Sequence, residues 1–484
     1  MEVKELNPQG LWSNFAALNA VPRPSKKEAR IIQFMLDFGR GLGLETINDA
    51  IGNVIIKKPA SVGMEDRQTI VMQSHIDMVH QKNETTVFDF DQQGIDMFVD
   101  GDWVRANGTT LGADNGIGVA AIMAVLASNE IKHPAIEALF TIDEETGMTG
   151  AMHVDPSNIT GTILLNLDTE DDDELSIGCA GGIDTTTTLA VEMVDLPSDF
   201  QTVEIQLRGL LGGHSGMDIH LGRGNANKLM NRLMYQLIAL VDLRLISFNG
   251  GSLRNAIPRE ATAVLAVPTA EFALFEKAYN DFVAVLTNEF ATIETEMFWK
   301  MSKIDAATQS VKHIDFERIL NSIYAVPNGV FRMSPDIENL VEASSSLAIV
   351  TVKDGQFVTQ SLQRSSVEST KSDIANAVRC AFESVGAAVV QGGEYPGWQP
   401  NAQSPILQLM TDLYKTTFKT DPKIKACHAG LECGILGKHF PKMDMISFGP
   451  NIRGAHSPDE CVQISSVQKF WEFLLSTLAS IPVK

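Results

Sequence analysis

Short apolar runs that end in histidine or acidic residues place the strongest limit on how this chain folds. Three such runs occur early in the chain: residues 69–72, followed by His75 and Asp77; residues 135–142, followed by Glu144 and Glu145; and residues 162–167, followed by Asp168. Runs of this length are typical of buried strands, and the helix-forming segments between them predict an α/β fold. In open α/β sheets, ligands bind at the carboxyl ends of the strands. We therefore expect these polar residues at one functional edge of a sheet.

The alternation of strands and helices stops and later resumes, which predicts one domain interrupted by another. Glycine-rich residues 178–182 precede a threonine-rich stretch with a period of two, and residues 392–400, rich in glycine and proline, close the intervening region. Past them the α/β pattern returns. We expect one domain to consist of residues 1–183 and 399–484, and an inserted α+β domain to consist of residues 184–398.

Local motifs predict particular elements inside these domains. The pair Asp354-Gly355 separates two apolar stretches, which is a strong signal for a β-hairpin in the insert. Residues 10–42 have an amphipathic pattern with a proline break, so we expect two helices there. Ser25 is a candidate cap for the second of these helices.

The composition indicates the cellular compartment of the protein and argues against some classes of partner. No run of about 18 apolar residues occurs, and the acidic start lacks the basic and apolar regions of a signal peptide. The five cysteines are scattered without a Cys-x-x-Cys pair, which is typical of free thiols in a reducing compartment. The formal net charge of -22 argues against nucleic acid or an anionic membrane as a partner. We expect a soluble cytoplasmic protein.

His75 and Asp77 form the first part of a candidate metal site. They are two residues apart at a strand end, so their side chains can face the same side. If His75 binds a metal through one ring nitrogen, Asp77 can accept a hydrogen bond from the other. An ordinary polar strand end is the alternative.

Asp114 directly precedes a helix expected at residues 116–128, where it fits either a helix cap or a carboxylate that bridges two cations.

Glu144 and Glu145 indicate a hydrolytic function for this site. Adjacent side chains of an extended or turning segment point in different directions, so one carboxylate can bind a metal while the other faces a bound water. A solvated acidic turn is the alternative. Asp168, at the start of an acidic run, and His456, in a loop after the strand expected at residues 443–448, also lie past strand ends. Ligands of this kind without thiolate suit zinc, with cobalt or manganese as substitutes, and five of them can hold two cations about 3.5–4 Å apart.

The order of these residues resembles the dizinc peptidase and aminoacylase family, which includes carnosinases and bacterial exopeptidases. The resemblance covers nearly the whole chain, and residues 212–216 and 428–434 are most similar to members that act on dipeptides. It implies an α/β, mixed-sheet dizinc exopeptidase catalytic domain interrupted by an inserted α+β lid domain. The implied activity is metal-dependent hydrolysis of Xaa-His dipeptides, including β-alanyl-histidine (carnosine). Deacylation of N-acyl amino acids on the same scaffold is the alternative. A non-enzymatic metal-binding or partner-binding protein is a third hypothesis, which Glu144 disfavours because metal affinity does not require it.

The resemblance also implies a role for each residue of the metal site. Asp114 would bridge two zinc ions, with the other ligands divided into two pairs, Glu145 and His456 on one ion and His75 and Asp168 on the other. Glu144 would be the general base, and Asp77 would orient His75. The peptide bond between Asp114 and Asn115 is expected to be cis.

By the same resemblance, the insert would supply the substrate contacts. His214 would stabilise the oxyanion, and Asn255 and Arg364 would bind the carboxylate of the substrate. In dimeric relatives the lid histidine and asparagine reach the active site of the other subunit, so a homodimer through the insert is implied. Glu432 fits either the substrate amino group or the first turn of a helix near residue 431.

Overall fold

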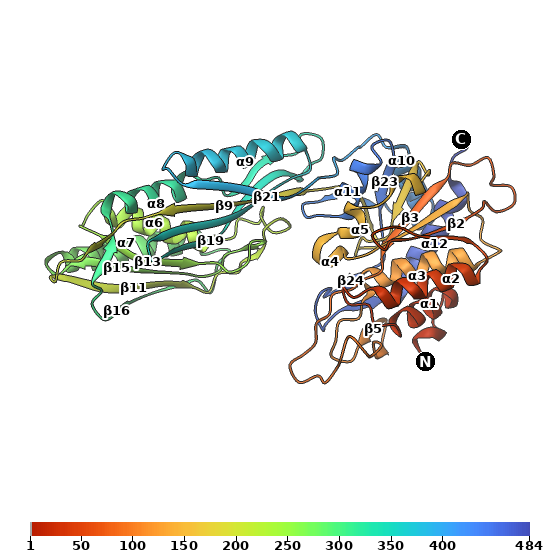
Figure 1. The fold of residues 1–484 in the computed structure, drawn as a ribbon, viewed down its shortest axis with the longest axis horizontal. Coiled ribbons are helices and arrows are strands. Elements are labelled where there is room, and N and C mark those ends of the chain that lie inside the picture. The colour runs from red at the N-terminus through yellow and green to blue at the C-terminus, as the bar shows by residue number, and fades with distance from the viewer. Residues whose placement is uncertain (1) are drawn as a thin grey trace. The chain divides into compact units, whose positions relative to one another are not determined.

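The computed structural model describes residues 2–484 and divides them into two units, each with its own sheet (Figure 1). Unit 1 comprises residues 2–178, 398–426 and 431–484, and unit 2 comprises residues 179–397 and 427–430. The short segment 427–430 belongs to unit 2, although the chain on both sides of it belongs to unit 1. Within the described residues, no helix combines the length and the apolar character needed to cross a membrane.

Unit 1 is built on a mixed sheet of eight strands in the order β1-β2-β6-β3-β7-β23-β8-β22. The strands are β1 (Glu45–Asn48), β2 (Val54–Lys58), β3 (Ile70–His75), β6 (Ile136–Thr141), β7 (Ile163–Asn166), β8 (Glu174–Cys179), β22 (Lys423–Cys427) and β23 (Asp444–Ser447). β6, β3, β7 and β23 run parallel to one another, whereas β2 is antiparallel to β6 and β8 is antiparallel to β23. The mixed α/β sheet predicted from the sequence is confirmed, and the carboxyl ends of four neighbouring strands meet at one edge.

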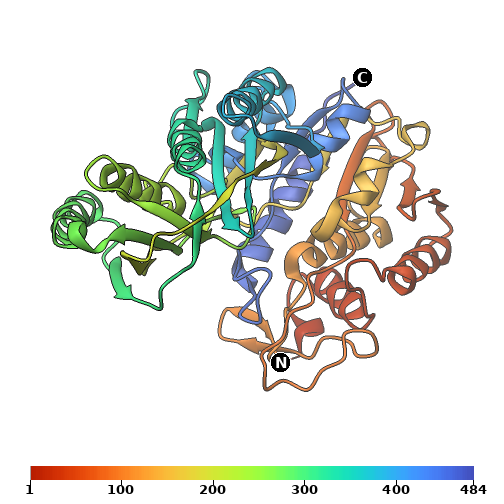
Figure 2. The ribbon, with the colours of Figure 1, turned by 60° about the vertical axis from the view of Figure 1, so that its left-hand side comes forward.

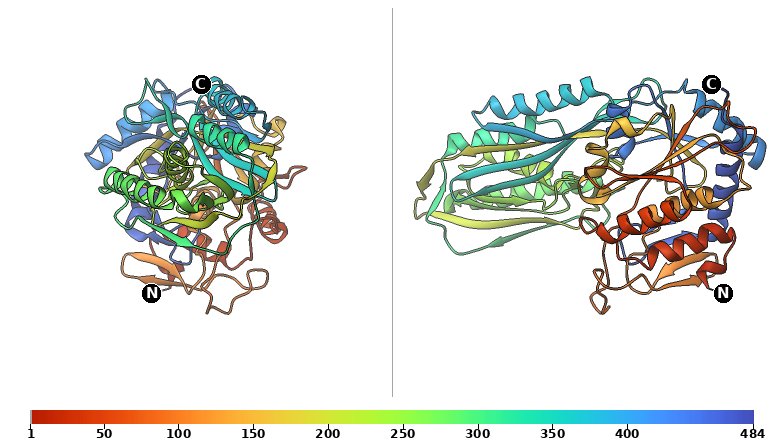
Figure 3. Two further views of the ribbon diagram at one scale, coloured as in Figure 1. Left: turned by 90° about the vertical axis from the view of Figure 1, so that its left-hand side faces the viewer. Right: turned by 45° about the vertical axis from the view of Figure 1, so that its right-hand side comes forward.

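The helices of unit 1 follow from its apolar patterns and caps. They are α1 (Gln9–Asn19), α2 (Ala29–Gly41), α3 (Ala113–Ala127), α4 (Glu144–Gly147), α5 (Thr149–Met152), α10 (Pro405–Phe418), α11 (Glu432–His439) and α12 (Ile464–Ser480). α3 is apolar on every side, so it is stable only as a buried helix, and Figure 3 shows α1 packed beside it. α10 begins where the side chain of Ser404 accepts a hydrogen bond from the N–H of Leu407 and Pro405 takes the first helical position.

A small sheet in unit 1 carries the loop that contains His456. Its order is β24-β25-β5-β4, with β4 (Met97–Asp100), β5 (Trp103–Ala106), β24 (Ile452–Arg453) and β25 (Cys461–Gln463). β24 and β25 pair antiparallel, so the loop between them is held at both ends. We did not predict this sheet, because strands of two to four residues are too short to show a period of two.

Unit 2 has a nine-stranded sheet with four long helices against it. The strand order is β16-β11-β15-β13-β19-β20-β9-β21, and β18 pairs with β19. The strands are β9 (Gly181–Ala190), β11 (Phe200–Arg208), β13 (Arg244–Gly250), β15 (Ala261–Pro268), β16 (Phe298–Lys303), β18 (Gly329–Met333), β19 (Val341–Lys353), β20 (Gln356–Ser365) and β21 (Ala388–Tyr395). Figure 2 shows the helices α6 (Ala226–Ile238), α7 (Phe272–Phe290), α8 (His313–Ala325) and α9 (Glu368–Glu383) along one side of this sheet. Apolar side chains of both layers, among them Val203, Leu233 and Phe316, form the core.

Two smaller strand pairs complete unit 2, and one of them carries His214. β10 (Met193–Asp195) pairs with β17 (Gln309–Val311), and β12 (Gly213–His214) pairs with β14 (Ala256–Ile257). The predicted hairpin is confirmed, since β19 and β20 are antiparallel neighbours joined by Asp354 and Gly355. These two residues have φ values of 50° and 74°, the positive values that a tight two-residue hairpin turn requires.

Candidate metal centre

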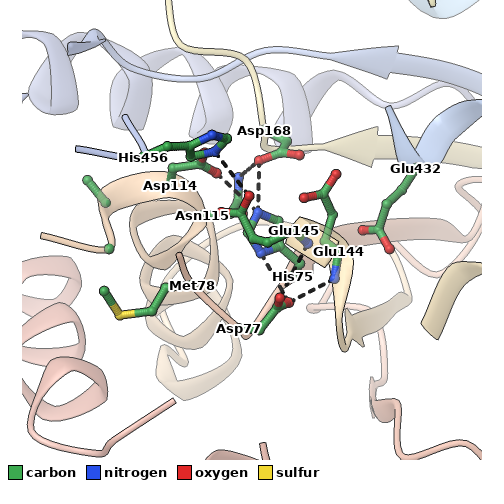
Figure 4. A network of polar contacts seen from close by, with 12 residues as sticks. His75, Asp77, Met78, Asp114, Asn115, Glu144, Glu145, Asp168, Glu432 and His456 are labelled. Carbon is green, nitrogen blue, oxygen red and sulfur yellow. Dashed lines mark hydrogen bonds and ion pairs between the residues drawn. The ribbon is translucent and has the colours of Figure 1, made fainter. Parts of the chain in front are cut away.

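The parallel strands of unit 1 bring the candidate ligands to one edge of the sheet (Figure 4). β3 ends at His75, and Glu144 and Glu145 follow β6 at the start of α4. Asp168 lies two residues past β7, and His456 lies in the loop between β24 and β25. Residues from separated parts of the sequence are therefore neighbours in space.

Imidazole nitrogens and carboxylate oxygens approach one another closely in this cluster. The shortest contacts are His456 Nε2 to Glu145 Oε2 at 3.0 Å, His75 Nε2 to Asp114 Oδ1 at 3.1 Å, His456 Nε2 to Asp114 Oδ2 at 3.2 Å and His75 Nε2 to Asp168 Oδ1 at 3.6 Å. Asp114 thus lies between the two histidines and turns one carboxylate oxygen toward each. Ligand atoms of His75, Asp114 and Glu145 all lie within 4.8 Å of one another, close enough to share one metal ion.

Asp77 holds His75 from behind. Its Oδ1 lies 3.4 Å from His75 Nδ1, which leaves Nε2 to face the cluster. Asp77 also accepts hydrogen bonds from the backbone N–H of Glu144 at 3.1 Å and from the Ser25 hydroxyl at 2.8 Å. One buried carboxylate therefore fixes the imidazole and the start of α4 together. The prediction of Ser25 as a helix cap is wrong, because its hydroxyl serves Asp77 and the N-cap of α2 is Glu28.

Asp114 lies at the beginning of α3 but does not cap it. The N-cap of α3 is Gly112, and Asp114 has φ -78° and ψ 110°, outside the helical region. The peptide bond between Asp114 and Asn115 is cis, as the family resemblance implied. The side-chain amide of Asn115 donates hydrogen bonds to Leu167 O at 2.7 Å and to the Asp168 carboxylate, which ties this segment to the end of β7. The position of Asp114 is therefore that of a carboxylate in the cluster and not that of a helix cap.

The charges of the cluster strongly perturb its pKa values. Hydrogen bonds with Asp114 and Glu145 raise the pKa of His456 to about 11. Burial by itself lowers the pKa of His75, but the charge of Asp168 and hydrogen bonds with nearby carboxylates raise this pKa well above its ordinary value. Burial raises the pKa of Asp114, yet hydrogen bonds with the two histidines lower it overall. The carboxylates thus favour positive charge at their centre.

The donor set fits a pair of divalent cations. Asp114, Glu145 and Asp168 bring three carboxylates to two imidazoles, and buried negative charge is costly unless a cation neutralises it. The Oε1 atom of Glu145 is buried and has no hydrogen-bond partner among the described residues, so it is open to coordination. Imidazole and carboxylate without thiolate are ligands that suit zinc.

Glu144 and Glu432 lie beside the cluster (Figure 4). Burial raises the pKa of Glu144 well above its ordinary value, although the charge of His75 opposes the shift. Glu432 is fully buried at the start of α11, and its Oε2 accepts hydrogen bonds from Gln73 Nε2 and Thr141 Oγ1, each at 2.6 Å. Glu432 therefore ties α11 to β3 and β6, and it lies in the first turn of this helix, as one of its two interpretations predicted.

Unit 2 gathers the three residues that were candidates for substrate contacts. In the β12–β14 pair, His214 lies opposite Ala256, the residue after Asn255. Arg364 is buried on β20, with Nη2 3.4 Å from His214 Nε2 and Nη1 donating a hydrogen bond to Tyr395 Oη at 2.8 Å. The three residues are therefore neighbours within one unit.

The imidazole of His214 is neutral and has a defined tautomer. Its Nδ1 accepts hydrogen bonds from the backbone N–H groups of Gly216 at 3.1 Å and Met217 at 2.9 Å, so the proton resides on Nε2. Burial, with the charge of Arg364, lowers the pKa of His214 to about 4. N–H donors of His214 and Arg364 consequently face each other, an arrangement that an anionic group between them would stabilise.

Two buried charged residues of unit 1, Arg23 and Glu460, were missed by the sequence reasoning. Arg23 is 1% exposed and Glu460 is 2% exposed. The sequence gives each of them only a positional signal: Arg23 lies between two prolines, and Glu460 follows His456 by four residues in the same loop. We interpreted the first segment only as a break between helices. Both residues contact the backbone that carries Asp114.

Comparison with known proteins agrees with this geometry. The sequence matches peptidase family M20/M25/M40 over residues 71–480. It is 43% identical to the cytosol non-specific dipeptidase of Escherichia coli (strain K12), with 100% of each chain covered. The crystal structure of aminoacylhistidine dipeptidase from Vibrio alginolyticus matches with a TM-score of 0.93 at 44% identity, over 100% of this chain and 99% of that one. An aminopeptidase from Bacillus cereus shares the fold, with a TM-score of 0.56 at 15% identity over 98% and 99% of the two chains.

Proposed function

The chain belongs to peptidase family M20/M25/M40 and is a peptide-bond hydrolase, and we propose that it is a dizinc dipeptidase that prefers Xaa-His substrates such as β-alanyl-histidine. The observation that carries this proposal is the close cluster of two imidazoles and three carboxylates with Glu144 beside it. The names of the relatives from E. coli and V. alginolyticus support a dipeptide substrate, and the second name supports histidine at its carboxyl end. The first name supports a cytoplasmic location.

We assign the residues of the cluster to two cations. Asp114 would be shared by both cations, and the remaining ligands would form two pairs, Glu145 with His456 and His75 with Asp168, which the contacts among these side chains support. When bound, two zinc ions supply Lewis acidity toward a water and toward the substrate carbonyl. Asp77 holds the tautomer of His75 that leaves Nε2 free for coordination.

Glu144 is the proposed general base. Its carboxylate takes a proton from the attacking water and later gives it to the leaving amine. Asp77 accepts hydrogen bonds from the N–H groups of Glu144 at 3.1 Å and Glu145 at 3.4 Å, so both side chains start from a fixed backbone. One glutamate can thus bind metal while its neighbour moves a proton.

His214, Asn255 and Arg364 of unit 2 form the proposed substrate-binding element. His214 carries its proton on Nε2, which suits a donor to the oxyanion. Arg364 and Asn255 would bind the substrate carboxylate, the arginine through charge-assisted hydrogen bonds. Homodimerisation through unit 2 is part of this proposal, and light scattering should then give the mass of two 52.7 kDa chains.

Metal removal tests the proposed reaction. Protein stripped with a chelator is expected to release no histidine from β-alanyl-histidine, because the Lewis acid is gone. Addition of two equivalents of Zn²⁺ should restore turnover, and cobalt or manganese should restore part of it. Activity that persists after complete stripping, measured by elemental analysis of the same sample, would exclude a metal-dependent reaction.

A substrate panel tests the specificity. We expect β-alanyl-histidine and other Xaa-His dipeptides to be hydrolysed with at least about tenfold higher kcat/KM than Xaa-Leu dipeptides. N-acetylhistidine should be inert. Faster hydrolysis of N-acyl amino acids than of dipeptides would instead identify a deacylase.

Arg364→Ala tests the proposed carboxylate contact. Loss of a hydrogen bond to a charged group costs about 1.5–3 kcal/mol, so kcat/KM should fall by roughly 10- to 150-fold, mainly through a higher KM. Arg208→Ala is the control, because Arg208 on β11 donates hydrogen bonds to backbone carbonyl groups of the same unit. Equal KM values in the two variants would contradict the role of Arg364.

A further inference from the structure

Glu460 binds the backbone that carries Asp114. Its carboxylate accepts four hydrogen bonds, Oε2 from the N–H groups of Leu111 at 2.7 Å and Gly112 at 2.9 Å, and Oε1 from those of Ala113 at 2.8 Å and Asp114 at 3.2 Å. These N–H groups precede and begin α3, where a helix leaves its first donors without intrahelical partners. Glu460 is 2% exposed, so little water competes for these bonds.

Glu460 also connects this backbone to His456. Both residues lie in the loop between β24 and β25, which turns through hydrogen bonds from Ser457 N to Gly454 O at 3.2 Å and from Glu460 N to Ser457 O at 3.1 Å. His456 has a positive φ of 64°, which is uncommon for a residue other than glycine. One loop therefore presents an imidazole to the side chain of Asp114 and a carboxylate to its backbone.

Arg23 binds the same backbone segment, by donating hydrogen bonds to carbonyl oxygens. Its buried guanidinium donates hydrogen bonds to Gly112 O at 2.5 Å, Asp77 O at 2.9 Å and Ile76 O at 3.2 Å. A Cβ atom at Gly112 would lie 2.5 Å from Arg23 Nη2, so this approach requires glycine. Arg23 thus joins the start of α3 to the strand end that carries His75.

We propose that Glu460 is a positioning residue for the metal centre, which fixes Asp114 and His456 relative to each other and thereby sets the affinity for metal. This inference rests on the proposed metal centre. Partners that orient metal ligands typically change metal affinity by about 10- to 100-fold when they are removed. If Glu460 only stabilised the fold, its replacement would lower the melting temperature and leave the metal affinity of the folded protein unchanged.

Glu460→Gln tests this inference on the full chain. The amide keeps one acceptor and turns an N–H donor toward two backbone N–H groups. Protein stripped with a chelator is titrated with Zn²⁺ by calorimetry and with Co²⁺ by visible absorption, which reports ligand geometry. We expect the affinity for at least one cation to fall about 10- to 100-fold and the Co²⁺ spectrum to change. Glu460→Asp, whose shorter side chain cannot reach all four N–H groups, should be intermediate.

Glu137→Gln is the matched control. Glu137 on β6 is 4% exposed and accepts hydrogen bonds from Thr160 N at 2.7 Å and Gly161 N at 2.9 Å, so the variant makes the same chemical change in the same unit. Its bonds lie at the amino ends of the parallel strands, the edge opposite the cluster. Melting temperatures of all variants record the loss of stability.

The outcomes separate this inference from the proposed function. Metal affinity and Co²⁺ spectra in Glu460→Gln that equal those of Glu137→Gln would overturn the role of Glu460. If Glu460→Gln does not fold, the same criterion applies to Glu460→Asp. An unmodified protein that binds neither cation after stripping would overturn the metal centre itself.

Discussion

Glu144→Ala is expected to lose hydrolysis and keep its metal. Removal of a general base lowers kcat by about 10²- to 10⁴-fold. The metal should stay because Glu144 lies beside the close contacts of the cluster, and because Asp77 holds this residue through its backbone N–H, which alanine retains. Zinc content and turnover of β-alanyl-histidine are to be measured on the same preparation.

Glu145→Ala is the control for this variant, because it removes the neighbouring carboxylate from the same segment. Glu145 Oε2 lies 3.0 Å from His456 Nε2, so we expect its loss to reduce metal content together with activity. Near-normal kcat in Glu144→Ala would remove Glu144 from the mechanism. Loss of zinc from that variant would make Glu144 a ligand instead of a base.

Asp114→Ala is expected to have the largest effect on metal binding. The carboxylate of Asp114 faces His75 at 3.1 Å and His456 at 3.2 Å, so its removal takes a ligand from both proposed cation positions. We expect the affinity for the second cation to fall by more than about 100-fold, beyond the usual effect of an orienting partner. Activity should be undetectable at zinc concentrations that saturate the unmodified protein. Co²⁺ titration and elemental analysis provide the measurement.

Asp172→Ala provides the comparison. Asp172 belongs to the same unit, and its carboxylate contacts Lys469 at 2.7 Å and Asn451 at 3.2 Å, so the variant removes a carboxylate whose partners are not proposed ligands. It should retain both cations. If Asp114→Ala also retains both with unchanged affinity, Asp114 is not a shared ligand.

The central strands of unit 1 could be predicted because both faces of each are covered. Every residue of β3, β6 and β7 is buried, and such strands appear in a sequence as continuous apolar runs. The start of α10 likewise has a local cause, because Ser404 and Pro405 mark it. These elements have local causes, so a local pattern reveals them.

Elements whose stability depends on distant partners could not be predicted in the same way. β4, β5, β24 and β25 are short, and each is defined by the strand beside it. The edge strands β16 and β18 of unit 2 leave most of their side chains partly or fully exposed, which blurs the alternation of apolar and polar residues. The pairing order of the strands in the two large sheets also lies outside any local pattern.

The same distinction applies to the candidate site. His75, Glu145 and Asp168 could be identified because each follows an apolar strand, and the structure places all three in one cluster. Arg23 and Glu460 were missed, because most of the hydrogen-bond partners of Arg23 and all four of those described for Glu460 are backbone groups. Every residue offers nearly the same backbone donors and acceptors, so such contacts leave no signature in the types of side chain.

Because most of unit 2 is inserted into the sequence of unit 1, a ribosome synthesises the residues of the proposed metal centre in two groups. Asp114, Glu145 and Asp168 precede the long segment 179–397 of unit 2, whereas His456 and Glu460 follow it. At about 5–20 residues per second, roughly 14 to 58 s pass between the synthesis of Asp168 and that of His456. The nascent chain thus carries three carboxylates of the cluster before the second histidine exists. Binding of cations to the proposed metal centre at full affinity must therefore await nearly complete synthesis.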